Sequence, residues 1–246
     1  MNISLLCPSR GRPEFIRELI YSALETAKYP EKLEFIFYID NDDKKSIYSI
    51  KNNLDYFIED VLEELRIKNF CSPKFIYDER IVLSEMWNKC WLEASADIFF
   101  HCGDDIRFRT KNWDEIVLNK FEEYNDKIVF VYGRDGIQPK TFGTHGFLHR
   151  NWTNLFGYFV PPYFSSDYND TWLNDVSKEI KRHIFVDIYT EHLHPVVHKH
   201  HWDKTHKERM VRGKLDNVDD LYIEKEPERK ECCKKLIEFI KTFNGI

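Results

Sequence analysis

The chain has 246 residues and a formal net charge of −6, with acidic and basic residues interleaved. This length suits one domain, or one domain with a C-terminal extension, and 42% hydrophobic residues can form a sizeable core. Because nucleic-acid-binding proteins usually carry a basic surplus, the charge argues against general nucleic-acid binding.

The spacing of the cysteines and the length of the apolar runs indicate the cellular compartment. The six cysteines show no CxxC spacing, and Cys7, Cys90 and Cys102 lie in apolar segments expected to be buried. A disulfide framework is therefore not expected, which favours a reducing compartment. The first apolar run is too short for a signal peptide, and no apolar stretch approaches the roughly 18 residues of a membrane span. We expect a cytoplasmic protein without an integral membrane segment.

The first half of the chain alternates between strand and helix patterns. Buried strands are predicted at 3–7, 33–39, 74–77, 97–102 and 127–132. Helices are predicted from Pro13 onward and over 44–66, 82–94 and 112–124. Strand and helix alternate four times, which is typical of right-handed βαβ units and a mostly parallel sheet.

The second half is less regular. Residues 142–169 are rich in aromatics, Gly and Pro and predict loops with short elements, and a helix over 169–182 and a strand over 184–188 follow. A His-rich segment occupies 192–206. The charged run 203–231 is interpreted as a solvent-exposed connection to an amphipathic helix over 228–243.

Three of the predicted strands end in polar clusters. The clusters are Pro8-Ser9-Arg10, Asp40-Asn41-Asp42-Asp43 and Gly103-Asp104-Asp105. Ligands of open α/β sheets bind at the carboxyl ends of the strands, so the clusters predict one cleft with many carboxylates. No Gly-rich phosphate loop is present. A diphosphate would then need Mn²⁺ or Mg²⁺, bound by one or two carboxylates plus phosphate oxygens.

Four segments resemble the GT-A glycosyltransferases, especially the inverting family 2 type. They are ISLLCPSRGRPEFI, LEFIFYID, LSEMWNKCWLEASADIFFHCGDDI, and HGFLHRNWTNLFGYF followed by NDTWL, which together span about residues 3–185. The resemblance implies a Rossmann-like α/β domain over 1–206 with a mostly parallel sheet. Its nucleotide-binding half would be 1–110, its acceptor half 111–206, and 207–246 would be a helical extension.

The resemblance also implies an activity. The chain would transfer a sugar, with inversion, from a nucleoside-diphosphate sugar to an acceptor hydroxyl in glycan synthesis, and we expect a UDP-linked donor. The acceptor could be a growing glycan, a glycoprotein glycan or a modified DNA base; the missing basic surplus favours a glycan.

The resemblance assigns donor-binding residues by position. Pro8 and Arg10 lie in the turn that receives the nucleotide, and Asp40 would meet the base. Asn88 falls where the family has a helix Asn near the nucleotide, and Arg80 is a candidate for the diphosphate. Arg10 could equally be a surface charge, as could Arg12.

The resemblance makes Asp105 the main metal ligand, while Asp104 would face the ribose or the metal. Gly103 stands where the family's DxD motif often has its first Asp. Some GT-A enzymes add a C-terminal His ligand. If residues 191–195 are extended, His192 and His194 point to the same face, and either could complete the site.

Asp170 matches the general base of the family. An inverting transfer needs a carboxylate on the acceptor side to take the hydroxyl proton. The family's preceding Glu is Asn169 here, so Asp167 remains an alternative base. Asp170 could also be only a helix cap. Trp87 is expected in the core, and His145 and His149 either line the acceptor pocket or pack inside.

Two other functions remain open. A nucleotidyltransferase would activate a sugar phosphate on a similar sheet, although it usually carries a Gly-rich loop after the first strand. A non-enzymatic module could bind metal or carbohydrate through the histidines of 192–206. The first alternative predicts release of pyrophosphate, and the second predicts metal binding that does not need Asp105.

Overall fold

Eight strands form one central sheet. The structure, a computed structural model, describes residues 1–245, and Ile246 lies outside the described residues. The strands are β1 (Ile3–Ser9), β2 (Leu33–Asp40), β3 (Lys74–Asp78), β4 (Ile98–His101), β5 (Ile106–Phe108), β6 (Phe130–Arg134), β7 (Gly146–His149) and β8 (His183–His192). They lie in the order β3-β2-β1-β4-β7-β6-β8-β5.

The first half of the sheet is parallel. β1 lies between β2 and β4 and pairs with both in parallel, and β2 pairs with β3 in parallel. The helices of this half are α1 (Pro13–Thr26), α2 (Lys44–Ser49), α3 (Asp55–Glu64) and α4 (Leu83–Leu92). A π-helical turn at Ile50–Leu54 joins α2 to α3, so one helical stretch occupies the predicted segment 44–66. The predicted alternation of strand and helix is confirmed.

The second half of the sheet is mixed. β7 is antiparallel to both β4 and β6, β6 is parallel to β8, and β5 is antiparallel to β8. The helices are α5 (Trp113–Glu122), α6 (Arg150–Asn154) and α7 (Asn169–Glu179). The sequence did not predict β5, and β8 is longer than the predicted 184–188. The pairing of β5 with β8 sets Ile106 opposite His192. Because Ile106 directly follows Asp105, this pairing brings His192 close to Asp105.

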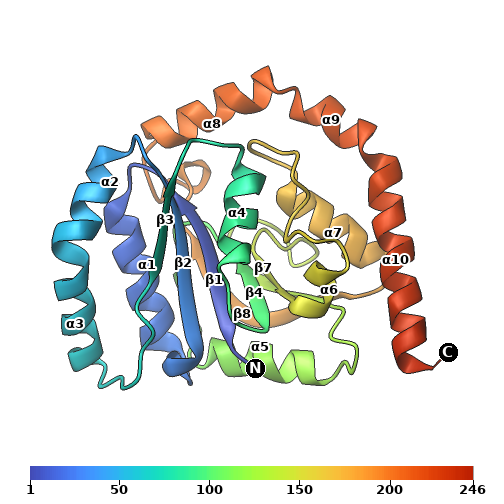
Figure 1. The fold of residues 1–246 in the computed structure, drawn as a ribbon, viewed down its shortest axis with the longest axis horizontal. Helices are drawn as coiled ribbons and strands as arrows, with labels where there is room; N and C mark the ends of the chain where they lie inside the picture. The colour runs from blue at the N-terminus through green and yellow to red at the C-terminus, as the bar shows by residue number, and fades with distance from the viewer. Residues whose placement is uncertain (246) are drawn as a thin grey trace.

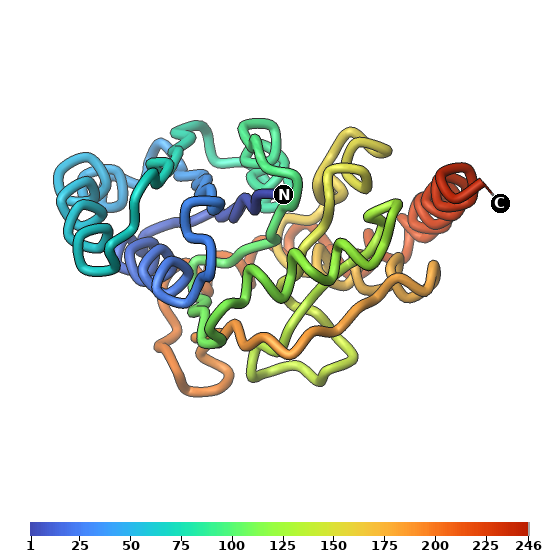
Figure 2. Tube along the Cα trace, turned by 90° about the horizontal axis from the view of Figure 1, so that it is seen from below, coloured from blue at the N-terminus to red at the C-terminus, as the bar shows by residue number. Residues whose placement is uncertain are grey.

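Two apolar clusters cover the two faces of the sheet. Successive side chains of a strand point to opposite faces, so Phe35 and Phe37 join one cluster while Ile36 and Tyr38 join the other. The first cluster includes residues of α1, α3 and α5, and the second includes residues of α4, α7 and the C-terminal helix. Figures 1 and 2 show α3 and that last helix at opposite ends of the molecule.

The C-terminal segment forms three helices, α8 (Lys204–Leu215), α9 (Val218–Glu224) and α10 (Glu226–Asn244). In Figure 1 they arch over the carboxyl ends of β1–β3 and descend beside α7. Most residues of 203–231 are solvent-exposed, as interpreted from the sequence, but the run forms α8, α9 and the start of α10 and packs on the domain through a few buried residues. Asp203 caps α8 by accepting the amide N–H of His206 at 2.9 Å, and Gly213 is buried so close to Ser166 that a Cβ would lie 2.5 Å from its Oγ. Few residues of this run face inward, so its charge pattern did not predict the packing.

The cysteines are all unpaired. Cys71 is exposed, whereas the other five are buried, among them Cys7, Cys90 and Cys102 below the carboxyl ends of the strands. Within residues 1–245, no helix is both long enough and apolar enough to cross a membrane.

Candidate active site

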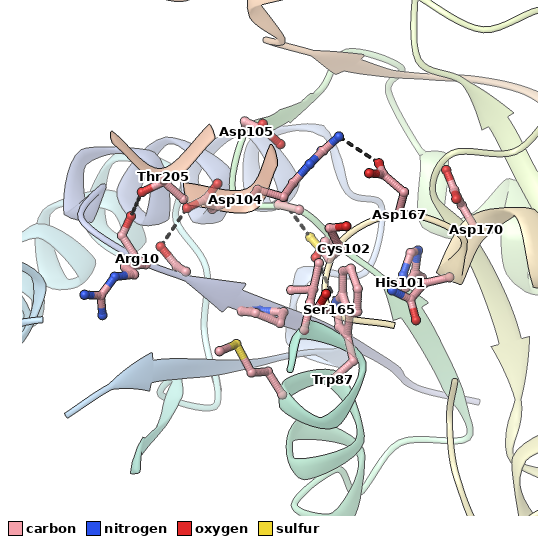
Figure 3. Close-up of a pocket in the computed structure, with 18 of the residues that line it drawn as sticks. Arg10, Trp87, His101, Cys102, Asp104, Asp105, Ser165, Asp167, Asp170 and Thr205 are labelled. Atoms are coloured by element: carbon pink, nitrogen blue, oxygen red, sulfur yellow. Dashed lines mark hydrogen bonds and ion pairs between the residues drawn. The ribbon is translucent and has the colours of Figure 1, made fainter. Parts of the chain in front are cut away.

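A cavity opens at the carboxyl ends of β1, β2 and β4, with α8 and the start of α7 beside it (Figure 3). The predicted site residues that line it are Pro8, Arg10, Asp40, Arg80, Asp104, Asp105, Asp167, Asp170 and His192. Two predicted residues, Asn88 and His194, do not line it. The convergence of the three polar strand ends, inferred from sequence, is present in the structure.

Asp40 ends β2 and is 2% exposed. Its Oδ2 accepts a hydrogen bond from Arg10 Nη1 at 2.8 Å and lies 3.8 Å from Arg80 Nε. Burial raises the pKa of Asp40, although Arg10 opposes the shift. Within the described chain its Oδ1 has no hydrogen-bond partner, so this oxygen could accept an N–H group from a ligand.

Arg12 holds together three segments around the cavity. Its Nη1 donates to Asp104 Oδ1 at 3.0 Å, and its Nε donates to Asp203 Oδ2 at 2.6 Å. Its Nη2 lies 2.8 Å from Nδ1 of His206. Arg12 is buried rather than a surface charge. Sequence reasoning included His206 only as a member of the His-rich segment and missed Asp203, although an Asp before a run of helix-favouring residues could have indicated the start of α8.

The acidic pair follows β4 directly. Asp104 accepts hydrogen bonds from Ser9 Oγ at 2.7 Å and from Arg12, and burial raises its pKa against the pull of Arg12. Asp105 turns back over Gly103. A Cβ at position 103 would lie 2.8 Å from Asp105 Oδ1 and 3.4 Å from Cε1 of His145. The Gly at the position expected for the first Asp of the motif therefore leaves room for the Asp105 carboxylate.

His192 is brought to Asp105 by the pairing of β5 with β8. Its Nε2 lies 3.4 Å from Asp105 Oδ1, and its Nδ1 lies 3.9 Å from Asp135 Oδ2. Burial disfavours the imidazolium, but the two carboxylates outweigh it and raise the pKa of His192 to about 9. Burial would also raise the pKa of Asp105, but His192 and then Arg12 hold it well below its usual range.

The donor set fits a cation that keeps part of its coordination for a substrate. Carboxylate oxygens of Asp104 and Asp105 suit Mn²⁺ or Mg²⁺, and His192 adds an imidazole nitrogen. Across residues 1–245, no group of three His, Cys, Asp or Glu residues is arranged to enclose a metal ion. Mg²⁺ is usually held by one or two carboxylates together with waters and substrate phosphates, and these residues match that pattern.

Asn88 and His194 have local roles. The Asn88 carbonyl oxygen accepts the amide N–H groups of Phe159 and Val160 at 2.9 and 3.0 Å, and its amide donates to the Val160 carbonyl at 2.9 Å. His194 Nδ1 accepts the amide N–H of Val196 at 3.3 Å. Asn88 therefore shapes the loop at 159–160, and His194 caps the short turn after β8.

Asp170 and Asp167 lie across the cavity from Asp104 (Figure 3). Burial raises the pKa of Asp170 to about 6, and its Oδ1 accepts the amide N–H of Thr171 at 2.8 Å. Asp167 is exposed and pairs with Arg209 at 2.8 Å. Both carboxylates line the cavity, but Asp167 is exposed and paired with Arg209, so Asp170, with its raised pKa, is the better candidate for a proton acceptor.

The cavity floor between these carboxylates is uncharged. Trp87 Nε1 donates to the carbonyls of Leu6 and Cys102, each at 3.1 Å, so Trp87 packs in the core and also fixes the ends of β1 and β4. His101 and His145 lie beside it, and burial lowers their pKa values to about 3 and about 4. His149 instead accepts the amide N–H of Asn151 at 3.0 Å and caps α6.

Comparison with known proteins supports the fold. No family model matches the chain, and no curated protein matches it in sequence. Solved structures do match. The mannosyltransferase PcManGT from Pyrobaculum calidifontis, in complex with GDP-Man and Mn²⁺, is 11% identical with a TM-score of 0.59, covering 98% of this chain and 73% of that one. TarS 1–349 from S. aureus in complex with UDP-GlcNAc is 11% identical with a TM-score of 0.53, covering 99% and 73%.

A third similar structure is TarS 1–349 in complex with UDP, which is 13% identical with a TM-score of 0.55 over 77% of this chain and 60% of that one. The chain therefore spans less than three quarters of each of these proteins. At this identity the likeness concerns the fold. It confirms the α/β GT-A fold expected from the sequence, including a helical C-terminal region.

Proposed function

We propose that the protein is a glycosyltransferase that moves a sugar from a nucleoside-diphosphate sugar to an acceptor hydroxyl. The observation that carries this proposal is one cavity in a GT-A fold, with Asp104 and Asp105 on one side and Asp170 on the other. This spacing of carboxylates separates the leaving group of a donor from the attacking hydroxyl of an acceptor.

The donor nucleotide would bind along the ends of β1 and β2. Asp40 would accept an N–H of the base through its unpaired Oδ1, and Arg10 and Arg80 carry the positive charge nearest to it. Pro8, near the carboxyl end of β1, would lie against the nucleotide. A uracil or guanine ring offers N–H donors to such a carboxylate, so both UDP and GDP donors are tested below, with UDP the one expected from the sequence.

Asp105 would hold a divalent cation, together with Asp104 or His192. When bound, the cation would stabilise the negative charge of the departing nucleoside diphosphate. Arg12 balances the acidic pair from the opposite side, through Asp104 at 3.0 Å and Asp105 at 3.7 Å. A nucleotide that binds with its cation would therefore enter a cluster in which Arg12 already balances the charge of the acidic pair.

Asp170 would act as the base. With its pKa raised to about 6 by burial, it is a carboxylate at neutral pH and could take the proton of the acceptor hydroxyl as the sugar is transferred with inversion. Asp167 is less suited because Arg209 neutralises it at the surface. The acceptor that we favour is a glycan.

The first test is donor binding by the purified chain. Calorimetry with UDP-, GDP-, dTDP- and CMP-sugars, with and without Mn²⁺, should give one nucleotide that binds more tightly with metal. The variant Asp105→Asn should lose the metal effect. Asp187→Asn is the matched control, because Asp187 is exposed and does not line the cavity.

A second measurement identifies the reaction. With the binding donor, slow release of nucleoside diphosphate is expected even without an acceptor, since water can replace the hydroxyl. Formation of pyrophosphate from a nucleoside triphosphate and a sugar phosphate would indicate a nucleotidyltransferase instead. Metal binding that survives Asp105→Asn but is lost in a His192→Ala/His194→Ala variant would favour a histidine-based module.

A further inference from the structure

Part of the cavity floor contains buried polar groups that have no hydrogen-bond partner of ordinary geometry within residues 1–245. We call this region the neutral pocket and define it by Trp87, His101, His145, Ser165 and Asn169, which all line the cavity. Within the part of the chain that the structure describes, both ring nitrogens of His101 and of His145, the Ser165 hydroxyl and both amide atoms of Asn169 lack hydrogen-bond partners. These four residues are 4%, 8%, 3% and 2% exposed.

Such a group of unpaired atoms indicates a ligand. Buried polar side chains are nearly always hydrogen-bonded in folded proteins, and a neighbouring cluster of exceptions needs a cause. The cluster draws on four separate segments, β4, the loop before β7, the 165–166 loop and the start of α7, which converge on one cavity. A polar molecule in that cavity could satisfy all of them at once.

The chemistry of these groups matches sugar hydroxyls. Each hydroxyl both donates and accepts, and so do a serine hydroxyl, an asparagine amide and a neutral imidazole with one N–H. Burial, aided by His145, lowers the pKa of His101 to about 3, so its ring is uncharged at neutral pH. The Trp87 ring lies 4.0 Å from the His101 ring, centroid to centroid, and adds an apolar surface beside these polar atoms.

Charges around the neutral pocket do not favour an anion. The neighbouring carboxylate is Asp170, and His192 lies between the carboxylates of Asp105 and Asp135. The five arginines that line the cavity already bind acceptors of the protein. Their partners are Asp40 and Asp42 for Arg10, Asp104 and Asp203 for Arg12, Glu208 for Arg80, Asp167 for Arg209 and the Ile81 carbonyl for Arg212.

We propose that the neutral pocket binds the sugar of the donor and selects an uncharged hexosyl group over a uronic acid. This inference rests on the proposed function. A uronyl carboxylate in this position would lose its water without gaining a cation, and it would approach Asp170. An uncharged sugar would instead satisfy the unpaired atoms of His101, Ser165 and Asn169.

The wild-type protein provides the first test. Calorimetry in the presence of Mn²⁺ measures Kd for UDP, UDP-glucose and UDP-glucuronic acid, and for GDP, GDP-mannose and GDP-mannuronic acid. For the nucleotide that binds, the hexosyl donor should bind at least ten-fold more tightly than the uronyl donor. Equal binding, or tighter binding of the uronyl donor, overturns the inference alone. If only a dTDP donor binds, the same comparison uses dTDP-glucose and dTDP-glucuronic acid. Failure of the UDP, GDP, dTDP and CMP donors alike overturns the proposed function, and the inference with it.

Substitutions in the neutral pocket test whether its residues bind the donor sugar. Asn169→Leu and His101→Phe keep the side-chain size and remove the polar atoms; Asn52→Leu, on the exposed surface, is the control. Each pocket variant should weaken binding of the hexosyl donor at least five-fold and change the Kd of the nucleoside diphosphate less than two-fold. An equal loss for both ligands, or no loss, contradicts the inference. Ser165→Ala, a smaller change, serves if a pocket variant does not fold.

Discussion

The two ends of the cavity differ in whether their polar atoms have partners in the protein. At the charged end, Arg10 and Arg12 are already paired with acidic side chains, including residues of the segment before α8. At the neutral pocket, the polar atoms of His101 and Asn169 have no partners within residues 1–245. A ligand at the first end would mainly exchange existing ion pairs, apart from a contact with the unpaired Oδ1 of Asp40, whereas a ligand at the second end would supply hydrogen bonds that the protein does not.

This difference indicates which end of the cavity would supply affinity for the diphosphate and which would select the sugar. Exchange of one ion pair for another changes the free energy little, so the charged end would need a cation to favour a diphosphate. A site whose buried polar atoms await partners rejects an analogue that cannot supply them, because those atoms then stay unpaired. We therefore expect changes at the carboxylates to affect catalysis, and changes at the floor to affect the choice of sugar.

The largest expected effect is that of Asp170→Asn. Removal of the base should lower kcat of sugar transfer about 10²–10⁴-fold, the usual contribution of a general base, with little change in donor Kd. The measurement is initial-rate kinetics with a saturating donor. Asp167→Asn is the matched control and should retain most activity. A reversed result would make Asp167 the base.

The same variant should be more stable than the wild type. Burial raises the pKa of Asp170 to about 6, above its pKa in the unfolded chain. The protonated side chain therefore contributes stability that is fully present below the unfolded-state pKa and is lost as pH rises through about 6. At pH 7.5 an amide avoids the cost of a buried charge, and we expect a gain of about 1 kcal/mol, or about 2–4 °C in Tm. An unchanged or lower Tm would mean that the Asp170 carboxylate stabilises the fold.

The next effect is on the pH profile. Because the base must be a carboxylate, kcat/KM should fall below about pH 6 and reach about one tenth of its plateau near pH 5. Asp104, at the charged end, also has a raised pKa. The two are separated by the residual activity of Asp170→Asn, which should lose this acid limb. Persistence of the limb in that variant would assign it to Asp104.

Gly103→Ala should have a smaller effect, confined to the charged end. The new Cβ would lie 2.8 Å from Asp105 Oδ1, and a carboxylate can move away without disturbing the backbone. We expect metal-dependent donor binding to weaken about ten-fold, equal to about 1.4 kcal/mol, while Tm changes little. Calorimetry with and without Mn²⁺ measures the first and thermal unfolding the second. A large drop in Tm with unchanged donor binding would refute this account of Gly103.

The smallest effect on function is expected for Trp87→Phe. The phenyl ring keeps an apolar surface but loses the N–H that holds the carbonyls of Leu6 and Cys102. The Leu6 carbonyl keeps the N–H of Cys102 at 3.2 Å, so the loss falls on the Cys102 carbonyl and should cost about 1–3 kcal/mol of unfolding free energy, measurable by urea denaturation. Donor affinity should change less than five-fold. A much larger loss of affinity would mean that the indole itself binds the sugar.

Strand ends were predictable from sequence, whereas the contacts between distant segments were not. A buried apolar run followed by Asp40, or by Asp104 and Asp105, marks both a strand and the place where it ends. The pairing of Arg12 with Asp203 joins residues 191 positions apart, and no periodicity encodes it. His192 reached Asp105 through the unpredicted pairing of β5 with β8. The unpaired state of His101 depends on what surrounds it in three dimensions.

The buried thiols below the cavity offer an internal reporter. Burial raises the pKa of Cys90 and of Cys7, so these sulfurs stay protonated and protected in the folded protein, while Cys71 is exposed. Alkylation of the native chain should therefore modify Cys71 quickly, and Cys7, Cys90 and Cys102 only when the floor opens. The slow labelling rate of Cys102 would measure how often that floor opens, and its decrease on adding a donor would reveal binding without any mutation or tag.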